Sequence, residues 1–199
     1  MRKIGFLGVP EPTPEAQELF DDDLSHGGYV MNVSKLWAYR PSIVNGLFGL
    51  VGEAVSLGGL TFRQRGILVV ACASTLGDSY CSLAWGGKLA GVADADTAAS
   101  VLWGDDGPLT APEKALAAWA RKVARDPNST GADDVQALRD AGFDDGQIFA
   151  ITAFVALRLA FSTVNDALGV HPDAELGRTA PTEVVDAIRF GRSVGDQED

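Results

Sequence analysis

Cysteine and histidine are scarce in this sequence, which has two of each among 199 residues. Two cysteines cannot build a disulfide framework, and their number agrees with a reducing, cytoplasmic compartment. His26 and His171 lie far apart in the sequence, without clustered carboxylates. We expect His26 in a loop and His171 at the exposed end of a helix. The sequence therefore predicts neither a metal site nor a cofactor.

Positive charge and long apolar runs are also scarce. Lysine and arginine number 16 against 27 aspartates and glutamates, and the formal net charge is -11. Because no basic cluster is present, we expect no nucleic-acid partner. The most apolar stretch, residues 148–161, is interrupted by Arg158 and is shorter than a membrane span. The first ten residues do not form a signal peptide. We therefore expect a cytoplasmic protein without a membrane partner.

Strand signals are rare, whereas helix start signals recur along the chain. The start signals are Thr13-Pro14, Pro41, Thr61 with Gln64, Asp78, Thr110 with Glu113, Asp144 with Gln147, and Pro181. Apolar residues at helical spacing follow each of them. The sequence predicts an all-α fold with a single domain over residues 1–199, in which residues 195–199 form a frayed acidic tail.

Two of these predicted helices meet at Gly77. The first runs from Thr61 to Gly77 and is apolar on nearly all sides, so we expect it at the centre of the fold. The second begins after Asp78, which places Cys81 in its first turn. The helix dipole there favours a thiolate, whereas the Asp78 carboxylate opposes it. Cys72 lies in the middle of the first helix, so we expect a small core residue that forms no disulfide with Cys81.

The residues around this turn resemble those of the carboxymuconolactone decarboxylase and alkylhydroperoxidase D superfamily. Its members typically read Leu-Pro-x-Arg-x-Arg-Glu on one helix and Cys-x-Tyr-Cys-x-x-x-His across the following turn. The matching residues here are Leu60, Arg63, Arg65, Tyr80 and Cys81. Residues 109–116, 138–145 and 165–170 resemble the longer "peroxidase-related" branch. The resemblance spans residues 30–172 and implies an alkylhydroperoxidase D-like helical bundle that forms homo-oligomers.

Three positions depart from the superfamily pattern. Asp78 replaces the first cysteine, Trp85 replaces the histidine and Gly66 replaces the glutamate. The Cys-x-x-Cys-x-x-x-His motif is thus degenerate, and the dithiol cycle of active relatives cannot run. The resemblance leaves Cys81, Asp78 and Tyr80 as candidate catalytic residues.

It also leaves Trp85, Arg65 and Gly66 as candidate pocket residues, with Arg65 or Tyr80 supporting a leaving oxygen. Two functions remain open. The first is that of an antioxidant oxidoreductase, at most a weak one-cysteine thiol peroxidase acting on an organic peroxide. The alternative is a non-catalytic oligomer, or a member that binds a small apolar ligand. Lactone decarboxylation is less favoured, because the glutamate and the histidine are both replaced.

Overall fold

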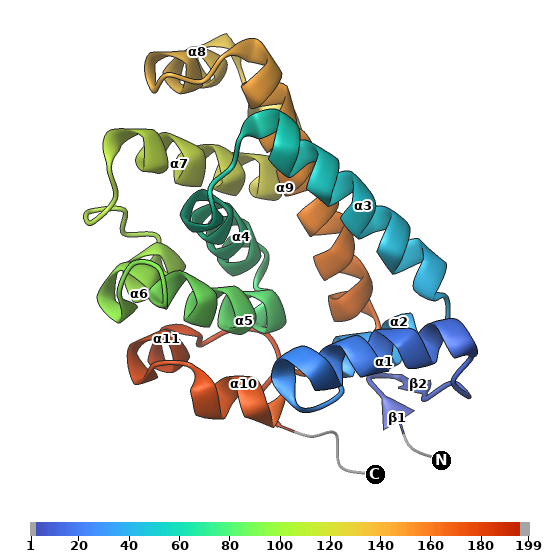
Figure 1. Cartoon of the computed structure of the whole chain (residues 1–199). Helices are drawn as coiled ribbons and strands as arrows, with labels where there is room; N and C mark the ends of the chain where they lie inside the picture. Colours follow the sequence, from blue (N-terminus) through green and yellow to red (C-terminus); the bar gives the residue numbers. More distant parts are fainter. Residues whose placement is uncertain (1–2, 196–199) are drawn as a thin grey trace.

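Eleven α-helices form nearly all the regular structure of residues 3–195, the part of the chain that this computed structural model describes (Figure 1). The helices are α1 (Pro14–Gly27), α2 (Asn32–Trp37), α3 (Pro41–Gly58), α4 (Phe62–Leu76), α5 (Ser79–Ala90), α6 (Ala95–Trp103), α7 (Ala111–Arg125), α8 (Ala132–Asp140), α9 (Asp145–Ala167), α10 (Ala174–Thr179) and α11 (Thr182–Ala187). The two-residue strands β1 (Lys3–Ile4) and β2 (Leu7–Gly8) pair antiparallel. The predicted all-α fold is confirmed.

Helix α4 lies at the centre of the bundle, as its apolar sequence predicted. Every residue from Gly66 to Ala73 is buried, and α4 packs against α5, α6, α7 and α9. The helix begins with the predicted capping box, in which the Gln64 amide donates to Thr61 Oγ1 at 3.2 Å. The Thr61 amide in turn donates to Gln64 Oε1 at 2.9 Å. A helix buried on all sides holds its neighbours in place, and α4 therefore fixes the position of α5.

Helix α9 packs along α3 and also contacts α7 and α4 (Figure 1). Among the described residues, α9 is the helix with the length and apolarity to cross a membrane, but only length and composition support that interpretation. Its packing against three helices and the buried Arg158 near its middle indicate a core helix of the bundle.

Several short elements were not predicted from the sequence. These are α2, α6, α8 and α10, of six to nine residues each, and the β1–β2 hairpin. Helices this short obtain most of their stability from tertiary packing, so their own sequence is a weak signal. His26 was expected in a loop, and that expectation is wrong: it lies in the last turn of α1, which Gly28 ends at a φ of 76°.

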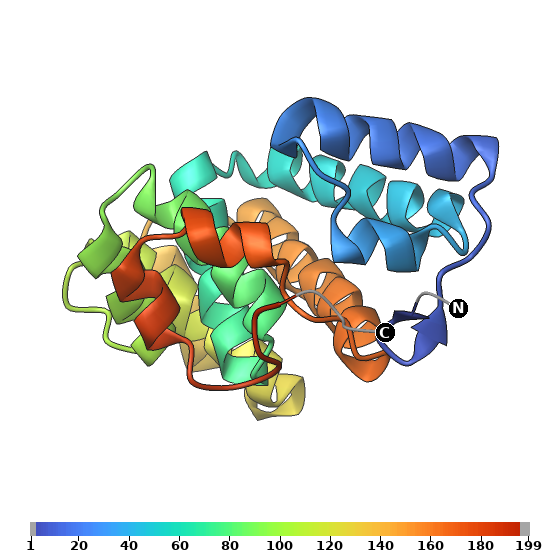
Figure 2. The same ribbon diagram turned by 90° about the horizontal axis from the view of Figure 1, so that it is seen from below.

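The C-terminal segment folds back over the bundle after α11 (Figure 2). The amide of Gly195 donates to the carbonyl of Pro172 at 3.1 Å. Apart from Gly195, the predicted acidic tail lies outside the described residues.

Candidate functional site

The turn from α4 to α5 positions Cys81. Gly77 adopts a φ of 78° and ends α4, a conformation that L side chains rarely adopt. Asp78 then caps α5, since its Oδ1 accepts the amide of Cys81 at 2.8 Å. The sequence prediction for this boundary is confirmed. Cys81 therefore lies three residues after the cap, in the first turn of α5.

Two side chains from α9 meet the Cys81 sulfur. Arg158 Nη2 lies 3.5 Å from Sγ, and Ser162 Oγ lies 3.6 Å from it. All three residues are buried, with Cys81 only 2% exposed and Arg158 only 4% exposed. The sulfur thus lies between the start of α5 and the middle of α9. A cation and a hydroxyl donor form hydrogen bonds to it.

The protonation of Cys81 follows from these surroundings. Burial raises the pKa of the thiol well above its ordinary range, and the Asp78 carboxylate raises it further. Arg158 and the hydrogen bond from Ser162 lower this pKa but do not outweigh burial. The sequence left open whether the helix dipole or Asp78 would prevail. In the structure, burial decides, and Cys81 is a thiol at neutral pH.

A pocket of about 270 Å³ opens beside Cys81. Its wall is mostly apolar and aromatic, with charged groups from α1, α5 and α9. The lining residues are Leu19, Asp22, Asp23, Met31, Val33, Ser34, Trp37, Val44, Phe48, Tyr80, Cys81, Ala84, Trp85, Lys88, Arg158 and Phe161. We call this space the Cys81 pocket. It contains the predicted residues Cys81, Tyr80 and Trp85.

Trp85 and Tyr80 both line this pocket, but they make different contacts. The Trp85 ring lies 5.7 Å from the Phe62 ring, and Lys88 Nζ lies 5.0 Å from the Trp85 centroid. The Tyr80 hydroxyl donates a short hydrogen bond to Asp173, whose other oxygen accepts the amide of Asn32 at 2.8 Å. Burial, and then the Asp173 charge, raise the pKa of Tyr80 well above its usual value. Its hydroxyl thus serves to tie α5 to the chain after α9.

The other two predicted pocket residues are not among those that line the Cys81 pocket. The Arg65 guanidinium lies over the Phe62 ring, 5.0 Å from its centroid. Gly66 faces α5: a Cβ placed there would lie 3.2 Å from Leu89 Cδ1. The tight packing of α4 on α5 gives a physical reason for glycine at this position.

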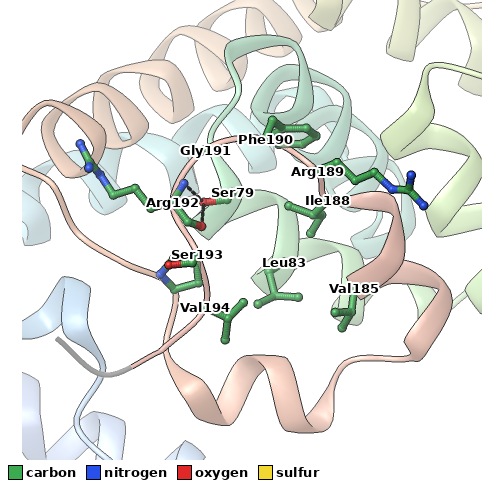
Figure 3. Close-up of a pocket in the computed structure, with 11 residues that line it drawn as sticks. Ser79, Leu83, Val185, Ile188, Arg189, Phe190, Gly191, Arg192, Ser193 and Val194 are labelled. Carbon is green, nitrogen blue, oxygen red and sulfur yellow. Dashed lines mark hydrogen bonds between the residues drawn. The ribbon is translucent and has the colours of Figure 1, made fainter. Parts of the chain in front are cut away.

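The C-terminal segment supports the turn from outside. The Arg192 amide donates to Ser79 Oγ at 2.9 Å, and that hydroxyl donates to the Arg192 carbonyl at 2.8 Å (Figure 3). A second pocket of about 290 Å³ lies between this segment and α5, and it includes Ser79, Leu83, Arg189 and Arg192. We call it the C-terminal pocket. Cys81 is not among its lining residues.

Behind the turn, the buried Asp78 acts on the carboxyl group of Asp166 in α9. Asp78 is fully buried, and its Oδ2 has no hydrogen-bond partner among the described residues. Burial and the Asp78 charge raise the pKa of Asp166 to about 7, although Arg192 opposes this shift. The start of α5 thus combines a buried carboxylate with a second carboxyl group that titrates near neutrality.

The remaining cysteine and histidines lie away from the pocket lining. Cys72 is buried in α4, where its thiol donates to the Val69 carbonyl at 3.3 Å, and burial raises its pKa to about 12. Both cysteines are free, as predicted. His171 is half-buried, with Nδ1 3.0 Å from the Ser193 carbonyl. Residues 3–195 contain no group of three or more potential metal ligands.

Sequence reasoning missed Arg158 and Ser162 as neighbours of Cys81. The signal for Arg158 was present, because it is the one charged residue in the most apolar stretch of the chain. A charge in such a helix must face a polar partner or a cavity. Ser162, one turn later on the same face, gave no comparable signal.

Known structures share this arrangement of helices, although comparisons of sequence alone find no relative of this chain. No protein-family profile matches the chain, and comparison with curated proteins gives no sequence match. A crystal structure of an alkylhydroperoxidase AhpD core, from a peroxidase-related protein of Ralstonia eutropha JMP134, superposes with a TM-score of 0.77. It is 24% identical, and the match covers 91% of this chain and 100% of that one. The chain has an alkylhydroperoxidase D-like fold.

Two further structures place other proteins on this AhpD-like fold. A peroxidase-related protein from Silicibacter sp. TM1040 has a TM-score of 0.76 and 22% identity, over 88% of this chain and 95% of that one. The debrominase Bmp8 has a TM-score of 0.71 and 14% identity, over 88% and 92%. A cysteine-to-alanine variant of that debrominase was crystallised with 2,3,4-tribromopyrrole. The fold therefore carries more than one activity, and the chemistry of this chain must be argued from its own residues.

Proposed function

We propose that this chain is a peroxidase-related member of the alkylhydroperoxidase D-like superfamily whose Cys81 pocket binds a small organic molecule. Its thiol supports, at most, slow reduction of organic peroxides. The observation that carries the proposal is the position of Cys81. The residue lies in the first turn of α5, beside a pocket, and Arg158 and Ser162 form hydrogen bonds to its sulfur. This position suits a nucleophilic thiol on this fold.

The reaction we propose uses one cysteine. The Cys81 thiolate attacks the terminal oxygen of a hydroperoxide, an S–O bond forms, and the O–O bond breaks. The leaving alkoxide takes up a proton and departs as the alcohol, and Cys81 becomes a sulfenic acid. One external thiol then forms a mixed disulfide and releases water. A second external thiol releases Cys81 and leaves as the external disulfide.

Arg158 and Ser162 are the groups best placed to support this attack. The Arg158 charge stabilises the thiolate and the negative charge that develops on the leaving oxygen. Ser162 donates a hydrogen bond toward the sulfur. We assign them the supporting role expected of Arg65 or Tyr80, because the Tyr80 hydroxyl is bonded to Asp173 and Arg65 lies against Phe62.

The same surroundings keep the reaction slow. Burial and Asp78 hold the pKa of Cys81 above its ordinary range, so the thiolate is a minor species at neutral pH. Asp78 replaces a resolving thiol, and Cys72 is enclosed in α4 with its own thiol bonded to Val69. Turnover therefore depends on an outside thiol. General acid–base help, which Gly66 and Trp85 do not provide, is typically worth about 10²–10⁴-fold.

The alternative function is binding without catalysis. The observation in its favour is the near-complete burial of a protonated Cys81 beside a pocket with a mostly apolar and aromatic wall. In this case the pocket retains a small ligand and the thiol does not turn over.

A peroxide-consumption assay separates the two functions. The protein is incubated with cumene hydroperoxide and a dithiol reductant, beside Cys81→Ser and the matched control Cys72→Ala. We expect slow consumption that Cys81→Ser abolishes and Cys72→Ala retains. Equal rates for the unmodified protein and Cys81→Ser would exclude thiol catalysis. If none of the three proteins consumes detectable peroxide, the result favours ligand binding without catalysis.

We also propose that the chain is a cytoplasmic, single-domain homo-oligomer. Ile43, Leu50 and Leu57 recur at seven-residue spacing on α3, and all three are exposed. Leu50 and Leu57 line a shallow apolar groove with Phe149 of α9, which is 69% exposed. Apolar side chains grouped in this way support association with a second copy. Light scattering that gives the mass of one chain at all concentrations would refute this proposal.

A further inference from the structure

Arg158 carries a buried charge that the described residues do not neutralise. A guanidinium has five N–H donors, and the hydrogen bond from Nη2 to the Cys81 sulfur is the one that the described residues accept. Nε is buried without a partner. Between residues 3 and 195, no carboxylate oxygen lies within 4.0 Å of this side chain. Buried charges in proteins are normally paired, because desolvation costs several kcal/mol per ion.

Aromatic rings surround the same guanidinium. Its central carbon lies 5.1 Å from the Phe161 centroid, 5.5 Å from Trp85 and 5.6 Å from Phe48. The three rings belong to the wall of the Cys81 pocket. They hold the cation in place by cation–π attraction and exclude water, but they do not accept its hydrogen bonds. The guanidinium is thus fixed at the pocket with donors to spare.

A second cation faces this pocket. Lys88 lies one turn beyond Trp85 on α5, and burial, followed by the Arg158 charge, lowers its pKa. The carboxyl groups of the pocket are already engaged. Asp22 Oδ1 lies 3.3 Å from His26 Nδ1, and Asp23 accepts the amide of Met31 at 2.9 Å. The formal charges of the lining therefore balance, in a chain whose net charge is -11, and Arg158 is its buried cation without a carboxylate oxygen within 4.0 Å among the described residues.

We propose that the Cys81 pocket selects a small organic anion, in which a carboxylate pairs with Arg158 and an apolar body packs against Trp85, Phe48 and Phe161. The fork of guanidinium donors matches a carboxylate. The cavity of about 270 Å³ is near the lower end of small-molecule sites, which suits an acid with a single ring. This assignment rests on the proposal that the Cys81 pocket is the functional site, and it names the class of its ligand.

Phenylacetate and phenylacetamide provide a matched pair of probes. They have the same number of non-hydrogen atoms, but only the acid is charged at pH 7. Isothermal titration at low ionic strength measures both affinities, and tryptophan fluorescence reports binding near the pocket tryptophans Trp37 and Trp85. We expect the unmodified protein to bind the acid at least about tenfold more tightly, a difference of about 1.4 kcal/mol.

Variants locate the cation responsible. Arg158→Met should bind acid and amide equally, and Arg158→Lys should keep part of the preference, because it retains the charge without the fork. Arg189→Met removes an exposed arginine of the C-terminal pocket and should behave like the unmodified protein. If Arg158→Met fails to fold, the acid-to-amide affinity ratios of the unmodified protein and Arg158→Lys still test the inference, which requires a smaller ratio in Arg158→Lys.

The outcomes distinguish this inference from the proposed thiol chemistry. Equal affinity for acid and amide in the unmodified protein overturns the inference, and so does a preference that survives in Arg158→Met. A preference lost in Arg189→Met also overturns it, because the anion would then bind in the C-terminal pocket. If the preference depends on Arg158 while Cys81→Ser leaves peroxide consumption unchanged, the inference stands and the thiol chemistry fails.

Discussion

Replacing Asp78 by asparagine removes the negative charge nearest to the Cys81 thiol but keeps the helix cap. Asparagine caps helices about as well as aspartate, so the hydrogen bond to the Cys81 amide should persist. Burial comes first among the causes that raise the pKa of Cys81, and the Asp78 charge comes second. The substitution therefore isolates the electrostatic part of the shift and leaves the thiol buried.

The size of the effect follows from Coulomb's law. Two charges about 4 Å apart interact with about 4 kcal/mol at an effective dielectric constant of about 20, which equals about three pKa units. We take this as an upper bound and expect the pKa of Cys81 to fall by about one to three units. Thiolate nucleophilicity falls with the pKa, so the gain in rate at a fixed pH below it is about threefold per unit.

The assay is the rate of alkylation of Cys81 by iodoacetamide between pH 7 and 10, followed by peptide mass spectrometry. Asp94→Asn provides the matched control, since Asp94 caps α6 in the same way through the amide of Thr97. We expect the alkylation rate at each pH in this range to rise by about threefold to thirtyfold in Asp78→Asn and to stay unchanged in Asp94→Asn. An unchanged rate in Asp78→Asn would refute the argument that Asp78 suppresses the thiolate.

Three further predictions concern the packing and titration of residues around this site. The folded protein keeps the Asp166 proton up to about pH 7, whereas the unfolded chain loses it near pH 4, so the free energy of unfolding falls as the pH rises through this window. Asp166→Asn should flatten that part of a plot of urea midpoint against pH. An unchanged slope would contradict this prediction. Gly191→Ala should lower the free energy of unfolding in urea by about 1–3 kcal/mol more than Gly104→Ala does. Both glycines have positive φ, but of the two only Gly191 would place a Cβ 2.5 Å from a backbone oxygen, that of Gly77. Equal losses would show that the C-terminal segment can move away without cost. Gly66→Glu should lower stability by about 1–3 kcal/mol through its contact with α5, and an undiminished urea midpoint would show that this interface can yield.

The helix boundaries near the site were predictable because their causes are local. A capping box, a glycine with positive φ and an aspartate cap act within a few residues, so Thr61, Gly77 and Asp78 marked the two helices correctly. The apolar run of α4 likewise indicated its central place. The short helices α2, α6, α8 and α10 were missed, because neighbours far along the chain stabilise them.

The surroundings of Cys81 depend on contacts between distant residues. The sequence determined that a cysteine begins a helix after an aspartate. The resemblance to the superfamily predicts that Asp78, Trp85 and Gly66 stand in place of its usual cysteine, histidine and glutamate. Only the tertiary structure brought Arg158 to the sulfur across 77 positions of sequence. It also determined the protonation of the thiol, because desolvation depends on what covers a group, and Cys81 is buried only in the folded protein.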